Sequence, residues 1–401
     1  MKIGIIKETK TPPDRRVAIT PEVAKAISEH FSDVSIVVQP SDIRAITDEE
    51  YLQHGIEVSE NIDDADILVG IKEVSIPTLK KDKHYMFFSH TGKKQPYNRP
   101  LLQKCAELNI TLTDYEYLTD ENHVRLIAFG RWAGIVGAYN TILTYGWKNK
   151  LFNLKRAYEC FDHEEMFKEL EHVKLPPVKI VITGGGRVAH GALETLSHLH
   201  IREVSPDDFL CNDYNEAVFC RLDPWHYTKH IRNEKHDLQH FIDHPYEYEA
   251  NFLPFALKAD IYIPCHFWDP RSPEFLKPED YLHPDFKISV IGDVSCDIKK
   301  PIASTLRASK IADPIYGYNP KTQQEDDPFK PGNITVMAID NLPAELPRSS
   351  SADFAHAFYH KVLPELLKGD ASEVIKRATI LKNGKLTPHF EYLKDYLEGR
   401  D

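Results

Sequence analysis

Residues 178–191, VKIVITGGGRVAHG, decide the fold of the region around them. An apolar, β-branched run passes into three glycines and then into apolar residues at helical spacing, which is typical of a strand, a tight turn and a helix. Backbone N–H groups at the start of such a helix, together with the helix dipole, favour a bound pyrophosphate. The stretch therefore predicts one βαβ unit of a dinucleotide-binding sheet.

The glycine positions fit the pattern GxGxxA, in which Ala189 takes the usual third glycine position. Gly184 and Gly186 permit the turn and the close approach of a cofactor, and Arg187 and Val188 open the helix beside it. By itself the motif is weak, because glycine turns also join strands to helices for purely steric reasons. Its place between an apolar strand and a helix favours the dinucleotide interpretation.

The next predicted strand covers residues 209–213 and ends in Asp213. A carboxylate there accepts hydrogen bonds from both ribose hydroxyls and repels a 2′-phosphate, which favours NAD and leaves NADP possible. The alternative is an ordinary turn aspartate, with Asp207 or Asp208 serving the ribose.

Upstream, short β-branched runs alternate with helical patterns, as in a parallel sheet with crossover helices. The first predicted helix follows Thr20 as its cap and Pro21 in its first turn. After Ala133 a long apolar helix pattern begins, and we place a domain boundary at about Gly134. The predicted strands before that boundary are residues 2–6, 35–38, 67–72, 85–89 and 110–114.

Composition narrows the class of partner. With 401 residues the chain is long enough for two domains with a cleft between them. The 49 Lys and Arg are outnumbered by 61 Asp and Glu, so a nucleic-acid backbone or an anionic membrane would be repelled. No apolar run reaches the ~20 residues of a membrane span, and the apolar start is too short for a signal peptide. We expect a cytoplasmic protein with small-molecule partners.

A polar, His-rich insertion separates Asp213 from Ala259. Its pairs His226/His230 and His236/His240 have helical i, i+4 spacing, which in principle suits a metal ion. No carboxylate or thiol companion stands at ligand spacing, and the six cysteines lack CxxC spacing. We therefore expect a solvated helical face and no metal site.

Several segments together resemble the alanine dehydrogenase and saccharopine dehydrogenase superfamily, in the order of that family and over nearly the whole chain. Four of them look closest to the lysine-forming saccharopine dehydrogenases and the lysine-ketoglutarate reductase region of bifunctional enzymes: SHT, AFGRWAG, DVSCD and IDNLPAELPR. Reductase relatives often have an apolar residue where this chain has Gly92. The remaining segments are KETKTPPDRRVAITP, GIKEV, GGGRVAHGA and NGKLTPHFEYL.

The resemblance implies an α/β chain of two Rossmann-like doubly wound domains. Residues 1–134 and 341–401 would form a discontinuous substrate-binding and catalytic domain. Residues 135–340 would form the dinucleotide-binding domain, with the His-rich insertion at about 214–258. The implied reaction is the reversible NAD(P)-dependent condensation of L-lysine and 2-oxoglutarate to saccharopine.

The resemblance also implies site residues. Lys72 and His90 end neighbouring predicted strands, so both should emerge at the carboxyl edge of the sheet, and in the family the matching residues carry acid–base work. The lysine needs a lowered pKa for this role. Matching residues contact substrate at five positions: Arg16, Arg125, Glu73, Glu116 and Phe129. Two further aspartates, Asp293 and Asp340, would lie beside the cofactor.

Two other functions compete with this one. An alanine dehydrogenase would share the lysine, the histidine and the N-terminal arginine but would use pyruvate and ammonium. A non-catalytic NAD-binding regulatory protein would keep the fold without turnover. Retention of Lys72, His90, Arg16 and Arg125 together argues for an enzyme.

Overall fold

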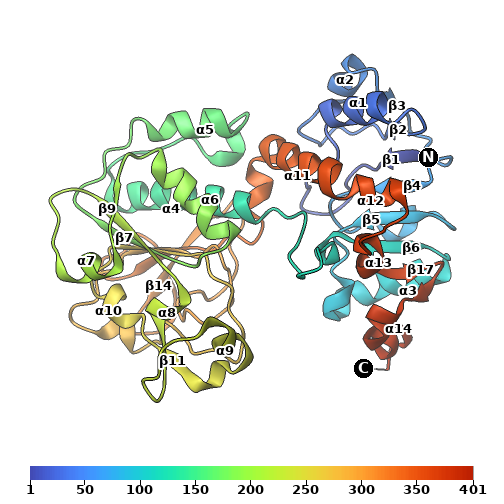
Figure 1. Ribbon diagram of the computed structural model, residues 1–401. Coiled ribbons are helices and arrows are strands. Elements are labelled where there is room, and N and C mark those ends of the chain that lie inside the picture. The colour runs from blue at the N-terminus through green and yellow to red at the C-terminus, as the bar shows by residue number, and fades with distance from the viewer. Residues whose placement is uncertain (401) are drawn as a thin grey trace. The chain divides into compact units, whose positions relative to one another are not determined.

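The computed structural model describes residues 1–400, which form two compact units. The first unit comprises residues 1–129 and the chain from Pro347 onward, and the second comprises Gly130–Leu346. Each unit is built on its own eight-stranded sheet (Figure 1). None of the helices within residues 1–400 combines the length and the apolarity that a membrane crossing requires.

The sheet of the first unit has the order β18-β17-β6-β5-β4-β1-β2-β3. Strands β1 to β6 are parallel, and β17 and β18 add an antiparallel edge. The order 3-2-1-4-5-6 of the parallel strands is that of a doubly wound sheet, whose ligands bind where the order reverses. The strands are β1 (Lys2–Ile5), β2 (Ser35–Val38), β3 (Glu57–Val58), β4 (Ile67–Val69), β5 (His84–Phe87), β6 (Thr111–Asp114), β17 (Thr379–Lys382) and β18 (Lys385–Leu386).

Helices and 3-10 turns connect these strands. Thr20 occupies the predicted N-cap position of the first helix, but its side chain makes no capping hydrogen bond. Burial of Ala24 and Ile27 against the sheet holds that helix instead. The helical elements are α1 (Pro21–His30), α2 (Asp48–Gln53), η1 (Ile76–Thr78), η2 (Thr91–Lys93), η3 (Pro96–Asn98), α3 (Arg99–Glu107), η4 (Tyr115–Tyr117), α11 (Pro347–Lys361), α12 (Leu363–Lys368), α13 (Val374–Ala378), η9 (Pro388–Leu393) and α14 (Lys394–Glu398).

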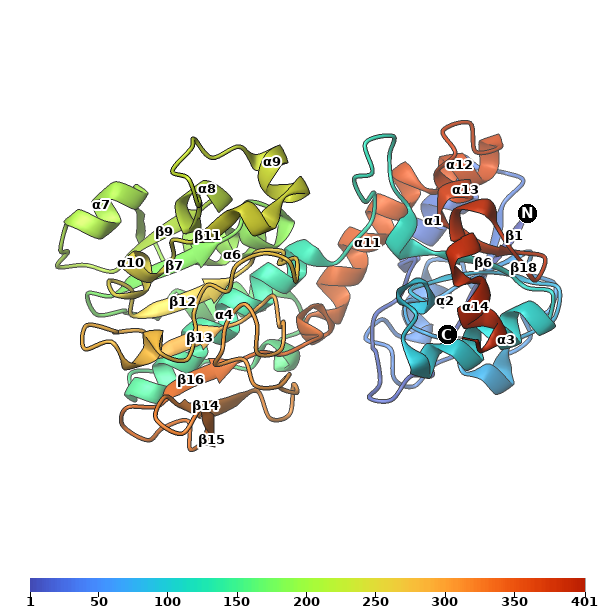
Figure 2. The ribbon, with the colours of Figure 1, turned by 90° about the horizontal axis from the view of Figure 1, so that it is seen from below.

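The sheet of the second unit has the order β15-β14-β16-β13-β12-β7-β9-β8, of which Figure 2 labels the strands from β15 to β9. Six strands are parallel, and β14 and β15 form an antiparallel edge. The strands are β7 (Lys179–Thr183), β8 (Arg202–Glu203), β9 (Val218–Leu222), β12 (Ile261–Pro264), β13 (Val290–Gly292), β14 (Ile315–Asn319), β15 (Gln324–Asp326) and β16 (Ile334–Met337).

The helices of the second unit pack closely on its sheet and on each other. A side chain at Gly134 or Gly191 would collide with the backbone of the facing helix, so these glycines let α4 and α6 approach. The helical elements are α4 (Gly130–Asn149), η5 (Ala157–Glu159), α5 (His163–Leu170), α6 (Arg187–Ser197), α7 (Pro206–Cys211), α8 (Pro224–Tyr227), α9 (Leu238–Asp243), η6 (Pro245–Glu247), α10 (Leu253–Ala256), η7 (Asp280–Leu282) and η8 (Leu342–Glu345).

One predicted strand is wrong. The segment expected as a strand at residues 209–213 belongs largely to α7, where Ser205 caps the helix and Pro206 fits its first turn. The strand next to β7 on that side of the sheet is β9, which lies inside the range assigned to the insertion, and β12 pairs with β7 on the other side. The excursion from the sheet is therefore confined to the hairpin of β10 (Thr228–His230) and β11 (Tyr248–Ala250) with the short helices around it.

Candidate functional site

Two predicted residues of the first unit follow neighbouring strands at the carboxyl edge of its sheet. Lys72 follows β4 and His90 follows β5, which are neighbouring parallel strands. Glu73 joins them, because its Oε1 lies 2.7 Å from Nδ1 of His90. The sheet topology thus brings together side chains that are separated in the sequence.

Lys72 sits in a setting that disfavours its charged form. The side chain is partly buried, and among residues 1–400 its Nζ makes no hydrogen bond or ion pair. Burial and the positive charge of Arg16 lower the pKa of Lys72 from its usual value. A lysine with a lowered pKa can accept a proton closer to neutrality than a solvated one.

Glu73 keeps its charge beside these two residues. Burial alone would raise its pKa, but hydrogen bonds from His90 and from Nζ of Lys10, at 2.7 Å, outweigh burial and hold the pKa of Glu73 at about 2. The carboxylate orients the His90 ring through Nδ1 and leaves Nε2 as the nitrogen directed at other partners.

Two carboxylates that the sequence interpretation did not single out fix the loops that carry Lys72 and His90. Glu8, directly after β1, accepts the backbone N–H groups of Ile71 and Lys72 at 2.6 and 2.9 Å. Asp114, at the end of β6, accepts the hydroxyl of Ser89 at 2.6 Å and the backbone N–H groups of Ser89 and His90. Their signal in the sequence was their position at the ends of predicted strands.

His90 itself has a left-handed backbone conformation, with φ of 55°. A non-glycine residue adopts this conformation only where its surroundings support it. The hydrogen bond of its N–H to Asp114 and that of its ring to Glu73 supply the support.

Arg16, which the sequence predicted to contact substrate, is buried. Its side chain is 2% exposed, donates to both carboxylate oxygens of Asp14 and stacks over the ring of Phe129 at 4.2 Å. Phe129 in turn stacks on Phe354 with centroids 4.8 Å apart. Arg16 is therefore a fixed positive charge near Lys72, and its guanidinium is already paired with Asp14.

Arg125 is the more accessible arginine of the predicted pair. Its side chain is 46% exposed and its guanidinium lies 2.5 Å from Oε1 of Glu116. Lys93 contacts the same carboxylate oxygen at 2.9 Å. Glu116 thus gathers two cations at one place in the first unit.

Gly92 lies in η2, which directly follows His90, and packing leaves no room for a side chain there. A Cβ there would collide with the hydroxyl of Tyr117, and Tyr392 donates its hydroxyl hydrogen to the carbonyl of Gly92 at 2.9 Å. Two tyrosines thus contact Gly92, one at the position that a side chain would take and one at its carbonyl oxygen.

The glycine loop of the second unit has the geometry of an anion cradle. Gly184 has φ of +116°, and a Cβ there would lie 2.7 Å from the carbonyl oxygen of Cys265. Gly186 is the N-cap of α6, and a Cβ there would meet open space. The first N–H groups of α6 are thus free of steric cover, as a pyrophosphate requires.

A pocket of about 520 Å³ opens at this loop. It is lined by the three glycines, Arg187 and Val188, and by His266, whose buried Nε2 has no hydrogen-bond partner within residues 1–400. The open start of α6 beside this pocket makes it the candidate site for a polar ligand.

The predicted ribose contact Asp213 is at the wrong end of the sheet. It is exposed and precedes β9, near Lys179 at the start of β7, whereas the glycine loop follows the end of β7. The carboxylate that follows β9 is Asp223, and a Cβ on Gly185 would approach its Oδ1 to 2.7 Å. Arg221 holds Asp223 through two hydrogen bonds of 2.5 and 2.9 Å. The error follows from mistaking α7 for the second strand.

Two other predicted cofactor residues do not line this pocket. Asp293 is fully buried after β13, and it accepts hydrogen bonds from Ser295, Cys296 and Thr305. Burial raises its pKa. The carboxylate of Asp293 thus holds the loop in which it lies. Asp340 follows β16 and is exposed.

Comparison with known proteins adds a family context to this geometry. The model of the family "Alanine dehydrogenase/PNT, N-terminal domain" matches residues 4–136. "Alpha-aminoadipic semialdehyde synthase, mitochondrial" of Mus musculus is 27% identical over 97% of this chain and 47% of its own length. The chain thus spans about half the length of the first curated relatives it matches.

A relative of similar length is "Saccharopine dehydrogenase [NAD(+), L-lysine-forming]" of Emericella nidulans, 25% identical over 96% of this chain and 97% of its own. A solved structure named L-alanine dehydrogenase matches 99% of the chain with a TM-score of 0.66 at 16% identity, which bears on the fold alone. These matches confirm the resemblance found in the motifs and the predicted α/β class with two Rossmann-like sheets.

Proposed function

We propose that this chain is an NAD(P)-dependent oxidoreductase that reversibly condenses L-lysine and 2-oxoglutarate to saccharopine. The observation that carries the proposal is the group of Lys72, His90 and Glu73 at one sheet edge, with the pKa of Lys72 lowered, in a chain similar to lysine-forming saccharopine dehydrogenases. In this proposal the first unit holds the amino acid and oxo acid, and the second unit holds the dinucleotide.

The reductive direction needs two proton transfers with the protein and one hydride transfer. The ε-ammonium of lysine must lose a proton before its nitrogen attacks the oxo carbon of 2-oxoglutarate. The resulting carbinolamine must then lose its oxygen as water, which requires a proton on that oxygen. The protonated imine that remains becomes the neutral secondary amine of saccharopine when its carbon accepts a hydride.

Lys72 is suited to the first of these steps. A neutral amine is needed to accept the proton of the substrate ammonium, and burial with Arg16 nearby favours the neutral form of Lys72. His90 is suited to the second, because its Nδ1 is held by Glu73 and the other ring nitrogen can pass a proton to the departing oxygen. Reversal of the same steps cleaves saccharopine.

Glu73, Glu116 and Arg125 complete the first unit's role. Glu73 steadies His90 and stays ionised at all working pH values, because its pKa is about 2. Arg125 offers a planar, partly exposed guanidinium that suits a substrate carboxylate, which would share or replace Glu116. Arg16, buried on Asp14, acts in this proposal chiefly by keeping Lys72 neutral, and Phe129 holds Arg16 in place.

A nicotinamide dinucleotide fits the second unit. Gly184 and Gly186 leave the start of α6 open for its pyrophosphate, and Asp223 is placed after the second paired strand for a ribose diol. When bound, the cofactor supplies or accepts the hydride. We infer a preference for NAD over NADP, because a 2′-phosphate would meet the carboxylate of Asp223.

A product assay tests the proposal. Purified protein is incubated with NADH or NADPH and with either lysine plus 2-oxoglutarate or pyruvate plus ammonium, and the products are identified by mass spectrometry. We expect saccharopine from the first pair and a much smaller rate with the second. Alanine as the main product would make the chain an alanine dehydrogenase, and binding of NADH without any turnover would leave a binding protein.

A further inference from the structure

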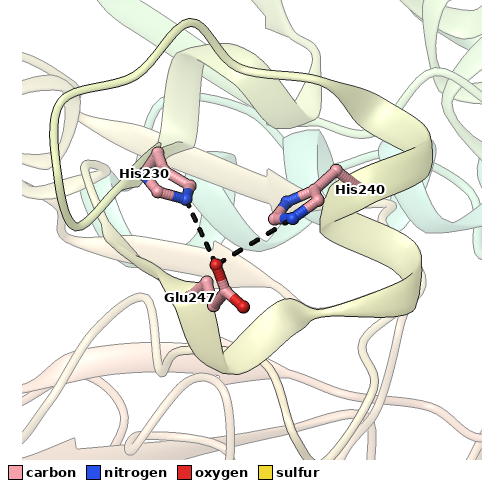
Figure 3. Close-up of side chains that lie close together, drawn as sticks. All are labelled: His230, His240 and Glu247. Carbon is pink, nitrogen blue, oxygen red and sulfur yellow. Dashed lines mark ion pairs between the residues drawn. The ribbon is translucent and has the colours of Figure 1, made fainter.

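Two histidines and a glutamate of the hairpin excursion converge in the second unit. His230 ends β10, His240 lies in α9 and Glu247 ends η6, so three successive elements each contribute one side chain (Figure 3). One ligand atom from each residue lies within 4.8 Å of the others. Oε2 of Glu247 is 3.5 Å from Nε2 of His230 and 3.9 Å from Nε2 of His240.

These separations are long for hydrogen bonds and close to those of ligands around one ion. Two atoms that bind a tetrahedral zinc ion at about 2.1 Å lie about 3.4 Å apart. Glu247 is within about 0.5 Å of this separation from each imidazole, and the two imidazole nitrogens, which lie within 4.8 Å of each other, would approach by up to about 1.4 Å on coordination. The i, i+4 pairs in the sequence did not predict this set, because His230 and His240 belong to different elements and the carboxylate companion is Glu247.

The buried histidine of the group points to a missing ligand. His230 is 2% exposed, and its Nε2 makes no hydrogen bond to any of residues 1–400. A buried ring nitrogen without a partner is unfavourable unless something occupies the position in front of it. That position is shared with His240 and Glu247, as Figure 3 shows.

Hydrogen bonds set the proton positions on the two rings. The hydroxyl of Tyr248 donates to the carbonyl of Asp237, so its oxygen accepts from Nδ1–H of His240 at 3.2 Å, and the lone pair of Nε2 is directed at the site. On His230, Nδ1 faces the N–H of Arg232 at 3.2 Å. Because Nδ1 accepts this N–H, the neutral ring carries its proton on Nε2, 3.5 Å from Oε2 of Glu247. Coordination through Nε2 therefore requires this proton to move to Nδ1 and the contact with Arg232 to break.

We propose that His230, His240 and Glu247 bind a divalent transition-metal ion of the zinc type. Two neutral imidazoles and one carboxylate are a common protein set for Zn²⁺, with the fourth position left to water. Arg232 lies 3.6 Å from Glu247 and is the cation that the metal ion displaces. It is two-thirds exposed and has Glu234 as a second partner at 3.2 Å.

The metal site has a structural consequence for the pocket beside the glycine loop, and this consequence rests on the proposed function. Leu238, Phe241 and Ile242 of α9 line that pocket, whereas His240 lies on the other side of the same helix. A helix of six residues is too short to be stable by itself. An ion that ties α9 to the hairpin would therefore fix one wall of the dinucleotide pocket.

Zinc binding by the full chain tests the site without any substrate or cofactor. The protein is stripped with a chelator and titrated with Zn²⁺ against a colorimetric zinc chelator, and Co²⁺ is used in parallel for its absorption spectrum. We expect one equivalent bound by the wild type and an affinity at least about tenfold lower in His240→Ala and in Glu247→Gln. The control His283→Ala, an exposed histidine of the same unit, should bind like the wild type.

Equal zinc affinity in the wild type and Glu247→Gln would overturn the proposal, as would the absence of a tetrahedral cobalt spectrum. Glu247→Gln keeps the side-chain size, so it stays informative if His240→Ala fails to fold. For the pocket wall, hydrogen exchange in residues 228–250 should slow on adding Zn²⁺, and NADH should bind more tightly. Failure of NADH to bind with or without zinc would count against the proposed function, and the zinc titration would still decide the metal site.

Discussion

Lys72 and His90 follow neighbouring strands, but their surroundings act on them differently: those of Lys72 lower its pKa, and those of His90 fix its orientation. Within residues 1–400, Nζ of Lys72 makes no hydrogen bond or ion pair, and burial together with the charge of Arg16 lowers the pKa of Lys72. His90 is held by a carboxylate on its ring and by another on its backbone. One residue is thus adjusted in basicity and the other in orientation, which are separate requirements for proton transfer.

Removing either group should slow turnover without affecting the dinucleotide. We expect Lys72→Met and His90→Gln each to reduce kcat by ~10²–10⁴-fold, while NADH binding, measured by fluorescence, stays within about twofold. Lys81→Met, at an exposed lysine of the same unit, is the control. Wild-type rates in either variant would remove that residue from the chemistry.

The pH profile should report Lys72. A lowered pKa means that the neutral amine is present from a lower pH. The rate in the condensing direction, in which Lys72 accepts the proton of the substrate ammonium, should therefore rise with pH and level off below the usual lysine value of 10.5. The negative charge of Glu73 raises the pKa of Lys72, so Glu73→Gln should move this limb of kcat/KM to lower pH. A shift to higher pH would contradict the assignment.

Asp223 and Asp213 form a matched pair for cofactor preference. Asp223 follows β9 near the glycine loop and pairs with Arg221, whereas Asp213 precedes the strand. We expect Asp223→Ala to release the guanidinium for a 2′-phosphate and shift the NADH/NADPH ratio of kcat/KM toward NADPH by about tenfold or more. Asp213→Ala should leave the ratio unchanged, and the reverse result would restore Asp213.

At the scale of elements, the turn between β7 and α6 contains two glycines with different roles: Gly184 is needed for folding, and Gly186 leaves room for the cofactor. At Gly184 the backbone is left-handed and a side chain meets Cys265, so Gly184→Ala should destabilise the second unit by ~1–3 kcal/mol. At Gly186 a side chain has room, so Gly186→Ala should leave the melting temperature unchanged. It should instead weaken the binding of NADH, whose pyrophosphate needs that space. Calorimetry and NADH titration of both variants check this difference, and equal stability would contradict it.

The contact of η8 with α4 carries a buried acid. Glu345 accepts a hydrogen bond from Asn140 at 2.8 Å, and burial raises its pKa to about 7. The folded state therefore binds a proton that the unfolded state releases above about pH 4.5, so stability falls as pH rises from that value to about 7. Above pH 7 the full loss, about 3 kcal/mol, is present.

Substitution by the neutral amide should remove this dependence. We expect Glu345→Gln to be more stable than the wild type at pH 8 and to lack the decline between pH 4.5 and 7 in urea unfolding monitored for the second unit. Glu171→Gln, at an exposed position of the same unit, is the control and should follow the wild type. An unchanged pH slope in Glu345→Gln would show that Glu345 is ionised in the folded protein.

For the whole molecule, substrate class is tested through Arg125. Saccharopine carries three carboxylates and alanine one, so the proposed reaction needs more cationic contacts than the alternative. Loss of a charge-assisted hydrogen bond costs ~1.5–3 kcal/mol. Arg125→Ala should therefore weaken the binding of 2-oxoglutarate by roughly ten- to a hundredfold and the binding of pyruvate far less. An equal loss for both oxo acids would favour an alanine dehydrogenase.

Most elements whose signal is local were predictable from the sequence. The strands before Lys72 and His90, the glycine turn and the first and fourth helices are within a few residues of their predicted positions. The strand before Asp213 was wrong because Phe209, Leu210 and Cys211 are as apolar in a short capped helix as in a strand, and only pairing with β7 distinguishes them.

The amino-acid pattern alone predicted the glycine loop, the α/β class and the positions of Lys72 and His90 at the ends of neighbouring strands, because strand, turn and helix periodicities are local properties. The acid–base roles of these two residues came from the family resemblance and stay a proposal. The tertiary structure decided which carboxylates surround that pair: Glu8 and Asp114 reach the loops from other strands, and Asp14 occupies Arg16. It also decided that His230, His240 and Glu247 meet. Such contacts depend on how a sheet orders its strands and how a hairpin closes, and no local sequence pattern encodes those distances.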